Sequence, residues 1–241
     1  MWLRFNIALW VSHAITNELI ELGNITRDRP GVYSRDPQYT LLKKNGYASS
    51  GYDHGHLAPA RDFKWSSAAW WESFYMTNMA PQNACLNQKG WCHLESHCRR
   101  WASTDSTNVI YIVTGIVPGD YIDTLCHTNG LQIYVPSQFF KAVLSYNRSS
   151  RDGRAIGFVM PNGNIDNHAI PEYACTIDSI ESITGLDLFS SLYNAFERRV
   201  ESEIGDFEFF QNLECSQKDC DRIYSGNRYP PEERTKLKCN Q

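Results

Sequence analysis

The chain has 241 residues, of which 42% are hydrophobic and 21% are charged, a composition that is ordinary for a soluble globular protein. Its length suits one large domain with a sizeable core, and it contains no apolar run near the roughly 18 residues of a membrane span. The formal net charge of −4 excludes a global positive field, so a nucleic acid would have to bind at a local patch.

The segments that carry clear secondary-structure patterns are taken in chain order. The stretch MWLRFNIALWVSHA looks like a weak signal peptide, but Asn6 interrupts its apolar run, so we expect it to begin the folded domain. Residues 24–50 are polar and turn-rich, which predicts a long surface excursion. Helical patterns cover 86–102, starting near Asn87, then 170–186 and 188–204. Apolar runs bounded by Gly, Pro or Asn predict strands at 74–81, 108–118, 131–146 and 154–162.

These elements predict an α+β fold in which helices cover a central, mostly antiparallel sheet. No repeat, charge block or Gly/Ser linker divides residues 1–204, which we expect to form the main domain. Residues 205–241 contain three cysteines and the sequence YPPEER. We expect them to form an extension packed on the same domain.

The number of cysteines predicts the compartment. They are spread over the last two thirds of the chain without a repeated C-x-x-C pair, which favours disulfides and hence an oxidising environment. The glycosylation sequons at Asn24 and Asn147 agree with this. We therefore expect a secreted glycoprotein whose disulfide pairing stays open. The eight cysteines are Cys85, Cys92, Cys98, Cys126, Cys175, Cys215, Cys220 and Cys239.

The helix expected over 86–102 carries an unusual polar stripe. Asn87, Glu95 and Arg99, with Trp91 between them, follow one another at intervals of four residues and so lie along one side of the helix. A hard cation such as Mg²⁺ binds oxygen ligands and keeps most of its waters, so one amide oxygen and a nearby carboxylate suffice. Arg99 could then bind a phosphate.

The stretch GYDHGHLAPARDF, residues 51–63, supplies a histidine that could face this stripe. The ordinary pKa of an imidazole lies near neutrality, so His56 could deprotonate a water molecule aimed at phosphorus. A metal would stabilise the charge that develops on the phosphate. Together the residues predict phosphodiester hydrolysis.

Three segments resemble, in order and spacing, the motifs of the DNA/RNA non-specific endonuclease family, which includes secreted bacterial nucleases and mitochondrial endonuclease G. They are GYDHGHLAPARD, FYMTNMAPQ and LNQKGWCHLE, beside the family patterns D-R-G-H, N-x-x-P-Q and L-N-x-x-x-W-x-x-L-E. The resemblance runs from about residue 8 to about residue 200. It implies a ββα-metal (His-Me finger) site that cuts DNA and RNA with Mg²⁺, or with Mn²⁺, and leaves 5′-phosphate and 3′-hydroxyl ends.

The same resemblance implies roles for individual residues. His56 matches the general base, and Asn87 matches the direct metal ligand. Glu95 matches the carboxylate that orients metal-bound water, and Arg99 matches the arginine one helical turn later. These four residues are therefore expected to form the centre of the site.

Three further residues belong to the same motifs. Asp53 matches the aspartate of the first motif, and Asn78 matches an asparagine that supports the site. His54 departs from the family pattern, because it stands where the family has an arginine that helps to neutralise the scissile phosphate. We expect His54 to carry a positive charge only below about pH 6.5, and therefore expect weaker activity with a more acidic optimum.

The same helix allows a different interpretation, a zinc site. Cys92, His93, His97 and Cys98 include two histidines four residues apart with thiols beside them. Zinc sites of this kind usually draw ligands from two separate segments, so we expect Cys92 and Cys98 to form disulfides instead.

Contacts with the nucleic acid are expected from cations near the site. Binding without sequence preference needs phosphate contacts, for which the candidates are Arg61, Lys64, Lys89 and Arg100. The tryptophans Trp65, Trp70, Trp71 and Trp91 could stack on bases, although core packing is the more ordinary role of this residue type.

Two functions from different classes follow. The first is a secreted, Mg²⁺-dependent endonuclease with DNA and RNA as substrates and no membrane partner, with mitochondria as the alternative compartment. The second is a weakened or inactive relative that binds nucleic acid or a protein. In this interpretation, His54 in place of the family arginine is the first sign that activity has been lost. The presence of His56, Asn87 and Glu95 favours the enzyme. Preference for DNA or RNA and the oligomeric state stay open.

Overall fold

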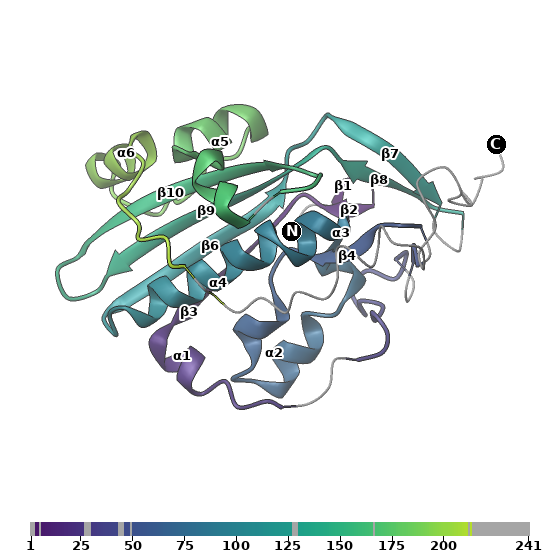
Figure 1. Ribbon diagram of the computed structural model, residues 1–241, viewed down its shortest axis with the longest axis horizontal. Coiled ribbons are helices and arrows are strands. Elements are labelled where there is room, and N and C mark those ends of the chain that lie inside the picture. Colours follow the sequence, from purple (N-terminus) through teal and green to yellow (C-terminus); the bar gives the residue numbers. More distant parts are fainter. Residues whose placement is uncertain are drawn as a thin grey trace.

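A five-stranded antiparallel sheet forms the centre of the fold (Figure 1). The computed structural model describes residues 3–4, 6–26, 30–42, 46–48, 50–126, 130–165, 167–211 and 213. The predicted α+β class with a central antiparallel sheet is confirmed. In sheet order the strands are β11 (Ala174–Cys175), β10 (Asp152–Pro161), β9 (Gln138–Asn147), β6 (Asn108–Ile116) and β3 (Trp10–Thr16).

The sheet has two apolar faces because successive side chains along each strand point to opposite sides. On one face, residues such as Ile112 pack against helix α4 (Gly90–Ser103). On the other face, residues such as Phe140 pack against α5 (Ile177–Thr184) and α6 (Asn194–Ser202). Helices therefore cover both faces, and α4 is separated from α5 and α6 by the sheet (Figure 1).

In the described part of the chain, three two-stranded antiparallel ribbons accompany the sheet. The ribbon of β4 and β5 leads into a helix, which gives the strand, strand and helix order of a ββα-metal motif. Pro81 lies inside β5 rather than ending a strand there, as proline is tolerated in a strand paired on one side only. The pairs are β1 (Leu3–Arg4) with β2 (Ile7–Ala8), β4 (Asp53–His56) with β5 (Met79–Gln82), and β7 (Tyr121–Cys126) with β8 (Gln132–Pro136).

Short helices complete the described part of the chain. Thr16 and Ser66 begin two of them by accepting a backbone amide three residues ahead. Among the described residues, no helix combines the length and the apolar character needed to cross a membrane. The short helices are α1 (Asn17–Glu21), α2 (Ser67–Glu72) and α3 (Ala84–Gln88), with the 3-10 helices η1 (Ala60–Phe63), η2 (Met76–Asn78) and η3 (Asn167–Tyr173).

Several predicted elements have different bounds in the structure. Residues 131–146 form two strands rather than one, because β8 ends at Pro136 and β9 turns into the central sheet. The helix predicted over 170–186 begins only at Ile177, where Thr176 caps it, and the helix predicted over 188–204 begins at Asn194.

The predicted surface excursion over 24–50 is partly wrong. In its described part, the side chains of Leu42 and Tyr47 are each only 1% exposed and belong to the main core. This segment therefore contributes packing as well as surface.

Asn147 closes the corner where β6, β9 and the β9–β10 hairpin meet. Its Nδ2 atom donates to Asp105 Oδ2 at 3.1 Å, Thr107 Oγ1 at 2.7 Å and Asn108 Oδ1 at 3.1 Å. Its Oδ1 atom accepts two backbone amides of the hairpin turn. One side chain thus joins the stretch that leads into β6 to the turn of the β9–β10 hairpin.

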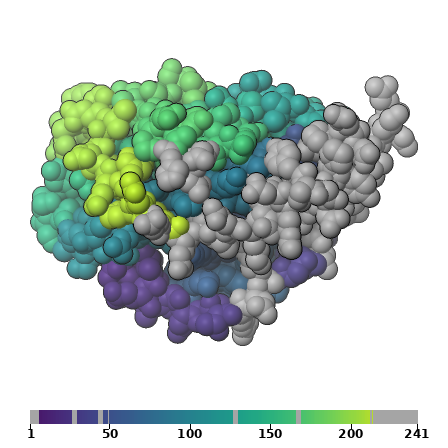
Figure 2. Space-filling view, in the orientation of Figure 1, coloured from purple at the N-terminus to yellow at the C-terminus, as the bar shows by residue number. Residues whose placement is uncertain are grey.

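The chain that follows α6 crosses the outer side of α4, where Figures 1 and 2 show it in yellow. Trp101 Nε1 donates to the carbonyl oxygen of Glu208 at 2.7 Å, and Phe207 packs on the same indole. The boundary predicted at residue 204 stays a prediction. Cys215, Cys220 and Cys239 lie outside the described residues.

Asn162 fixes the start of α3. This buried side chain donates to the carbonyl oxygens of Pro81 at 3.1 Å and Pro136 at 2.9 Å, and it accepts the backbone amide of Asn83 at 2.6 Å. Asn83 in turn caps α3 through the amide of Cys85. The position of α3 against β5 and β8 therefore depends on one amide group.

We expect the change Asn162→Ala to destabilise the fold by at least about 2 kcal/mol, because it leaves buried backbone groups without their hydrogen bonds. Urea unfolding of the variant and the parent measures this. Asn164→Ala, a nearby change in the same loop, is the control. An Asn162→Ala midpoint equal to that of the control would contradict the role given to this side chain.

Candidate active site

Strand β4 holds His56 in a largely apolar setting. The residue is 7% exposed and pairs with Met79 of β5. The Phe74 ring meets the imidazole edge-on, at 88° with 5.2 Å between centroids, and Tyr33 lies 6.0 Å away at 62°. A Cβ atom on the preceding Gly55 would lie 2.6 Å from Gln82 Cβ, an atom that cannot move without the backbone, so a larger residue would force β4 and β5 apart. The imidazole is thereby held in one orientation.

Asn78 supports the backbone that follows His56. Its Oδ1 atom accepts the amide of Ala58 at 3.0 Å, and its Nδ2 atom donates to the carbonyl oxygens of Ala58 and Ser73 at 2.8 Å each. The carbonyl oxygen of Asn78 also accepts the amide of Leu57 at 3.0 Å. Asn78 has the contacts of a supporting residue.

Asn87 lies next to the same strand. Its Nδ2 atom donates to Asp53 Oδ2 at 2.9 Å, and Gln88 Nε2 donates to the same oxygen at 2.7 Å. Asp53 belongs to β4, three residues before His56. The structure thus joins the strand of the predicted base to the helix of the predicted metal ligand.

The helix predicted over 86–102 is two helices. Asn87 is in α3, and Lys89, with φ −115° and ψ −98°, separates α3 from α4, which carries Glu95 and Arg99. The predicted stripe along a single helix is therefore wrong. Trp91 is 1% exposed and packs against Phe139, so it belongs to the core.

Arg99 is held in place by the buried carboxylate of Asp62. Its guanidinium donates to Asp62 Oδ1 at 2.8 Å and to Ser96 Oγ at 2.9 Å, and His13 Nε2 lies 2.9 Å from Asp62 Oδ2. Burial alone would raise the pKa of Asp62, but the hydrogen bond from His13 and the charge of Arg99 outweigh it and hold that pKa below its ordinary value. Arg99 is fixed in place by these contacts.

A hollow of about 330 Å³ lies beside this anchor. Among the described residues it is lined by four cationic side chains together with Ile20, Gly23, Ser96, Ser103 and Leu213, and none of these described lining residues is acidic. Three of the four predicted phosphate contacts are therefore together, whereas Lys89 lies at the helix break and outside the hollow. The cations are Arg61, Lys64, Arg99 and Arg100.

The sequence profile of the DNA/RNA non-specific endonuclease family matches residues 4–195. The chain belongs to this family. It is 33% identical over 201 residues to a mitochondrial nuclease of Saccharomyces cerevisiae. The aligned region covers 76% of this chain and 60% of the relative. It is 32% identical over 190 residues to mitochondrial endonuclease G of Bos taurus, with an aligned region that covers 74% of this chain and 62% of the relative.

A solved structure of similar fold is the crystal structure of an EndoG/EndoGI complex, which concerns the inhibition of EndoG. It matches with a TM-score of 0.65 and 25% identity over 79% of this chain and 81% of that chain. The chain spans about 60% of the length of the yeast and bovine relatives.

His54 replaces the arginine of the family motif without replacing its charge. Its ring is stacked between Tyr33 and Tyr47, with centroids 4.3 and 4.2 Å away. Burial lowers the pKa of His54 to about 4, although the charge of Asp53 opposes this. The expectation that His54 gains a charge near pH 6.5 is therefore wrong.

The zinc interpretation is also wrong. Cys92 is disulfide-bonded, as is Cys126, and His97 Nδ1 accepts the backbone amide of Phe210 at 3.4 Å. The disulfide expected at Cys98 is wrong as well, because this residue is a free, buried thiol. Cys85 and Cys175 are likewise free thiols, so the described cysteines are only partly oxidised.

Lys141 is a charged neighbour of the site that the sequence analysis missed. It is 1% exposed, its Nζ atom donates to Thr114 Oγ1 at 2.6 Å and lies 4.8 Å from the Trp91 ring centroid. Burial lowers its pKa, and the charges of Cys98 and Glu95 oppose that shift. The sequence signal that could have indicated a buried charge here is a single lysine within the apolar run QFFKAVLSY.

The burial of His54 predicts a pH dependence of stability. Because its pKa is about 4 when folded and about 6.5 when unfolded, the unfolded chain binds more protons between these values. Stability should therefore fall as the pH drops from 6.5 to 4, by on the order of 3 kcal/mol from this residue. His97, whose pKa is also lowered to about 4 by burial, adds to the loss.

Urea unfolding at pH 7, 5.5 and 4.5 measures this loss. His54→Phe keeps an aromatic ring between the two tyrosines without a group that titrates, so its stability should depend less steeply on pH than that of the parent. Equal slopes for the two proteins would show that folding leaves the pKa of His54 unchanged, which would contradict the lowering by burial.

Proposed function

We propose that this chain is a metal-dependent endonuclease that hydrolyses phosphodiester bonds in DNA and RNA. The single observation that carries the proposal is the pair of hydrogen bonds at Asp53, which hold α3 and Asn87 against the strand of His56. Membership of the endonuclease family supports the same activity.

The donor set suits a hard cation such as Mg²⁺, with Mn²⁺ as a substitute. The amide nitrogen of Asn87 donates to Asp53, so its Oδ1 atom points away from that carboxylate. Together with the carboxylate of Glu95, this provides the oxygen ligands that such cations prefer. A bound ion would stabilise negative charge on the phosphate.

In the proposed reaction, His56 accepts a proton from a water molecule whose oxygen attacks phosphorus. The bond between phosphorus and the 3′ oxygen breaks, the 3′ oxygen takes up a proton from solvent, and the products are a 5′-phosphate and a 3′-hydroxyl. The packing of Phe74 and Tyr33 around the imidazole keeps it aimed, and Asn78 fixes the chain behind it. Such a positioned base contributes roughly 10²- to 10⁴-fold.

Substrate binding is proposed at the cationic hollow. Arg61, Lys64 and Arg100 line it together with Arg99, on the same helix as Glu95. These side chains would contact phosphates rather than bases, which agrees with cleavage that does not depend on the sugar or the sequence. A chain with net charge −4 thereby has a local surface for a polyanion.

A second function, a binding module without activity, is favoured by one observation. His54 stays neutral above about pH 5, so the fixed charge of the family arginine is absent. Loss of one charge weakens phosphate neutralisation and leaves His56, Asn87 and Glu95 in place, so we keep the enzyme as the first proposal.

Two observations bear on the compartment. The disulfide bonds of Cys92 and Cys126 favour an oxidising compartment. The relatives named above from yeast and Bos taurus are mitochondrial, and these names do not support secretion. We therefore propose the mitochondrial alternative first and secretion second.

We expect His56→Ala to lower plasmid nicking in Mg²⁺ at least 100-fold, because the attacking water loses its base. Nicking is followed on gels with Mg²⁺, Mn²⁺ or EDTA, and EDTA should abolish it in the parent. Thermal unfolding checks that the variant is folded.

The matched control is His93→Ala, which removes a histidine of α4 that has no assigned role. It should nick plasmid at the parental rate. Undiminished nicking by folded His56→Ala would refute the assigned base, and no nicking by the parent in either metal would favour the binding module.

The hollow is tested by affinity. Arg100→Gln and Lys64→Gln should each weaken binding of a DNA duplex, measured in EDTA, and lower the slope of log K against log salt by about 0.9 for each lost phosphate contact. Arg198→Gln, an exposed arginine of α6 on the other side of the sheet, should leave both unchanged. Equal effects of all three changes would show that net charge acts, not the hollow.

A further inference from the structure

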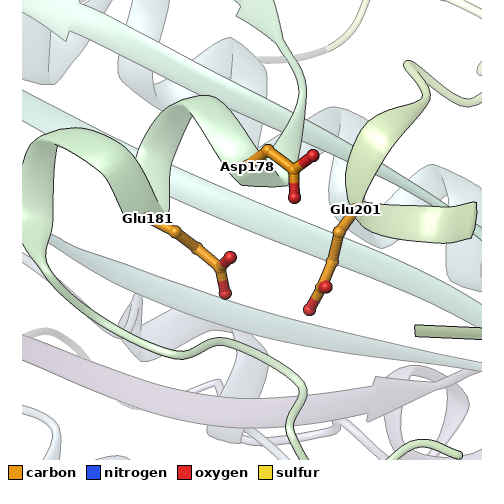
Figure 3. Close-up of side chains that lie close together, drawn as sticks. All are labelled: Asp178, Glu181 and Glu201. Carbon is orange, nitrogen blue, oxygen red and sulfur yellow. The ribbon is translucent and has the colours of Figure 1, made fainter. Parts of the chain in front are cut away.

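Three carboxylates from two helices meet on the face of the sheet opposite α4 (Figure 3). Asp178 and Glu181 come from α5, and Glu201 comes from α6. One oxygen of each lies within 4.8 Å of the others, and Figure 3 shows the side chains directed toward one another. Neither the proposed reaction nor the cationic hollow uses these residues.

Glu201 is the unusual member of the cluster. It is 8% exposed, and its buried Oε1 atom accepts no hydrogen bond from the described residues. Its pKa is raised to about 7, first by burial and then by the negative charges of its neighbours Glu181, Glu197, Asp178 and Asp187. A buried carboxylate in a negative field is costly unless a positive charge compensates for it.

The spacing of the oxygens suits one cation. Ca²⁺ binds oxygen ligands at 2.3–2.6 Å, so two ligands on opposite sides of the ion lie about 5 Å apart and the others lie closer. The three oxygens satisfy this limit. The carboxylate of Glu181 is fixed because its Oε1 atom accepts the amide of Leu188 at 2.5 Å. Asp178 is exposed, which leaves room for water ligands.

We propose that Asp178, Glu181 and Glu201 form a binding site for a hard divalent cation of the Ca²⁺ class. The ion joins α5 to α6, so it stabilises the helical layer on this face of the sheet. It lies on the opposite face from Asn87 and Glu95 and takes no part in phosphodiester hydrolysis. The site is independent of the proposed nuclease activity.

The experiment uses the full chain with Asn87→Ala, which removes the proposed metal ligand of the other site. After removal of metals with EDTA and dialysis, CaCl₂ is titrated by calorimetry and thermal unfolding is measured at pH 7. We expect one Ca²⁺ per chain and a rise in Tm of roughly 4 °C or more at saturation.

Three variants in this background locate the ion. Glu201→Gln is nearly isosteric, and Asp178→Asn is an exposed change that leaves the packing intact, so each should fold and weaken Ca²⁺ binding at least tenfold. Glu203→Gln, at the end of α6, removes the same charge outside the cluster and should leave binding unchanged.

Two results would overturn the proposal. The first is Ca²⁺ binding that is equally strong in Glu201→Gln, Asp178→Asn and Glu203→Gln. The second is the absence of Ca²⁺ binding in the Asn87→Ala background. In that case a higher Tm of Glu201→Gln in EDTA would show that Glu201 holds a proton instead. Plasmid nicking does not enter either readout, so failure here leaves the proposed nuclease untouched.

Discussion

The carboxylate of Asp53 is the contact on which the arrangement of the site depends. It accepts two side-chain amides, from Asn87 and Gln88, and so fixes α3 against a strand that also carries His56. Each hydrogen bond to an ionised acceptor is stronger than one between neutral groups. The same hydrogen bond orients the Asn87 amide. The contact that holds α3 against β4 therefore also sets the direction of Asn87 Oδ1.

A second constraint is the burial of charge beneath α4. Asp62 is held between His13 and Arg99, and Lys141 lies between the helix and the sheet with Thr114 as its hydrogen-bond partner. Removing one charge from such a group leaves another charge uncompensated in a poorly solvated place. The helix that carries Glu95 is thus held by electrostatics as well as by apolar packing.

The sequence predicted the class of fold and the central strands because long runs of β-branched and aromatic residues give a strong local signal. It also predicted roles for Asp53, His56 and Asn87, which the fold places on one strand and the helix that contacts it, and these roles stay predictions. It did not predict the break at Lys89, since the pattern from 86 to 102 suits one helix and the break comes from tertiary contacts of α3. The low pKa of His54 could not be predicted from the sequence either, because Tyr33 and Tyr47, which enclose its ring, come from other parts of the chain.

Asn147 has a consequence for covalent modification of the chain. An N-linked sugar would replace one of the two hydrogens on Nδ2, the atom that donates to Asp105, Thr107 and Asn108. The bulk of the sugar would also have to enter the corner between β6 and the hairpin. The folded corner and an oligosaccharide at this sequon therefore exclude each other, and a chain that received the sugar during synthesis would have to leave that end of the sheet open.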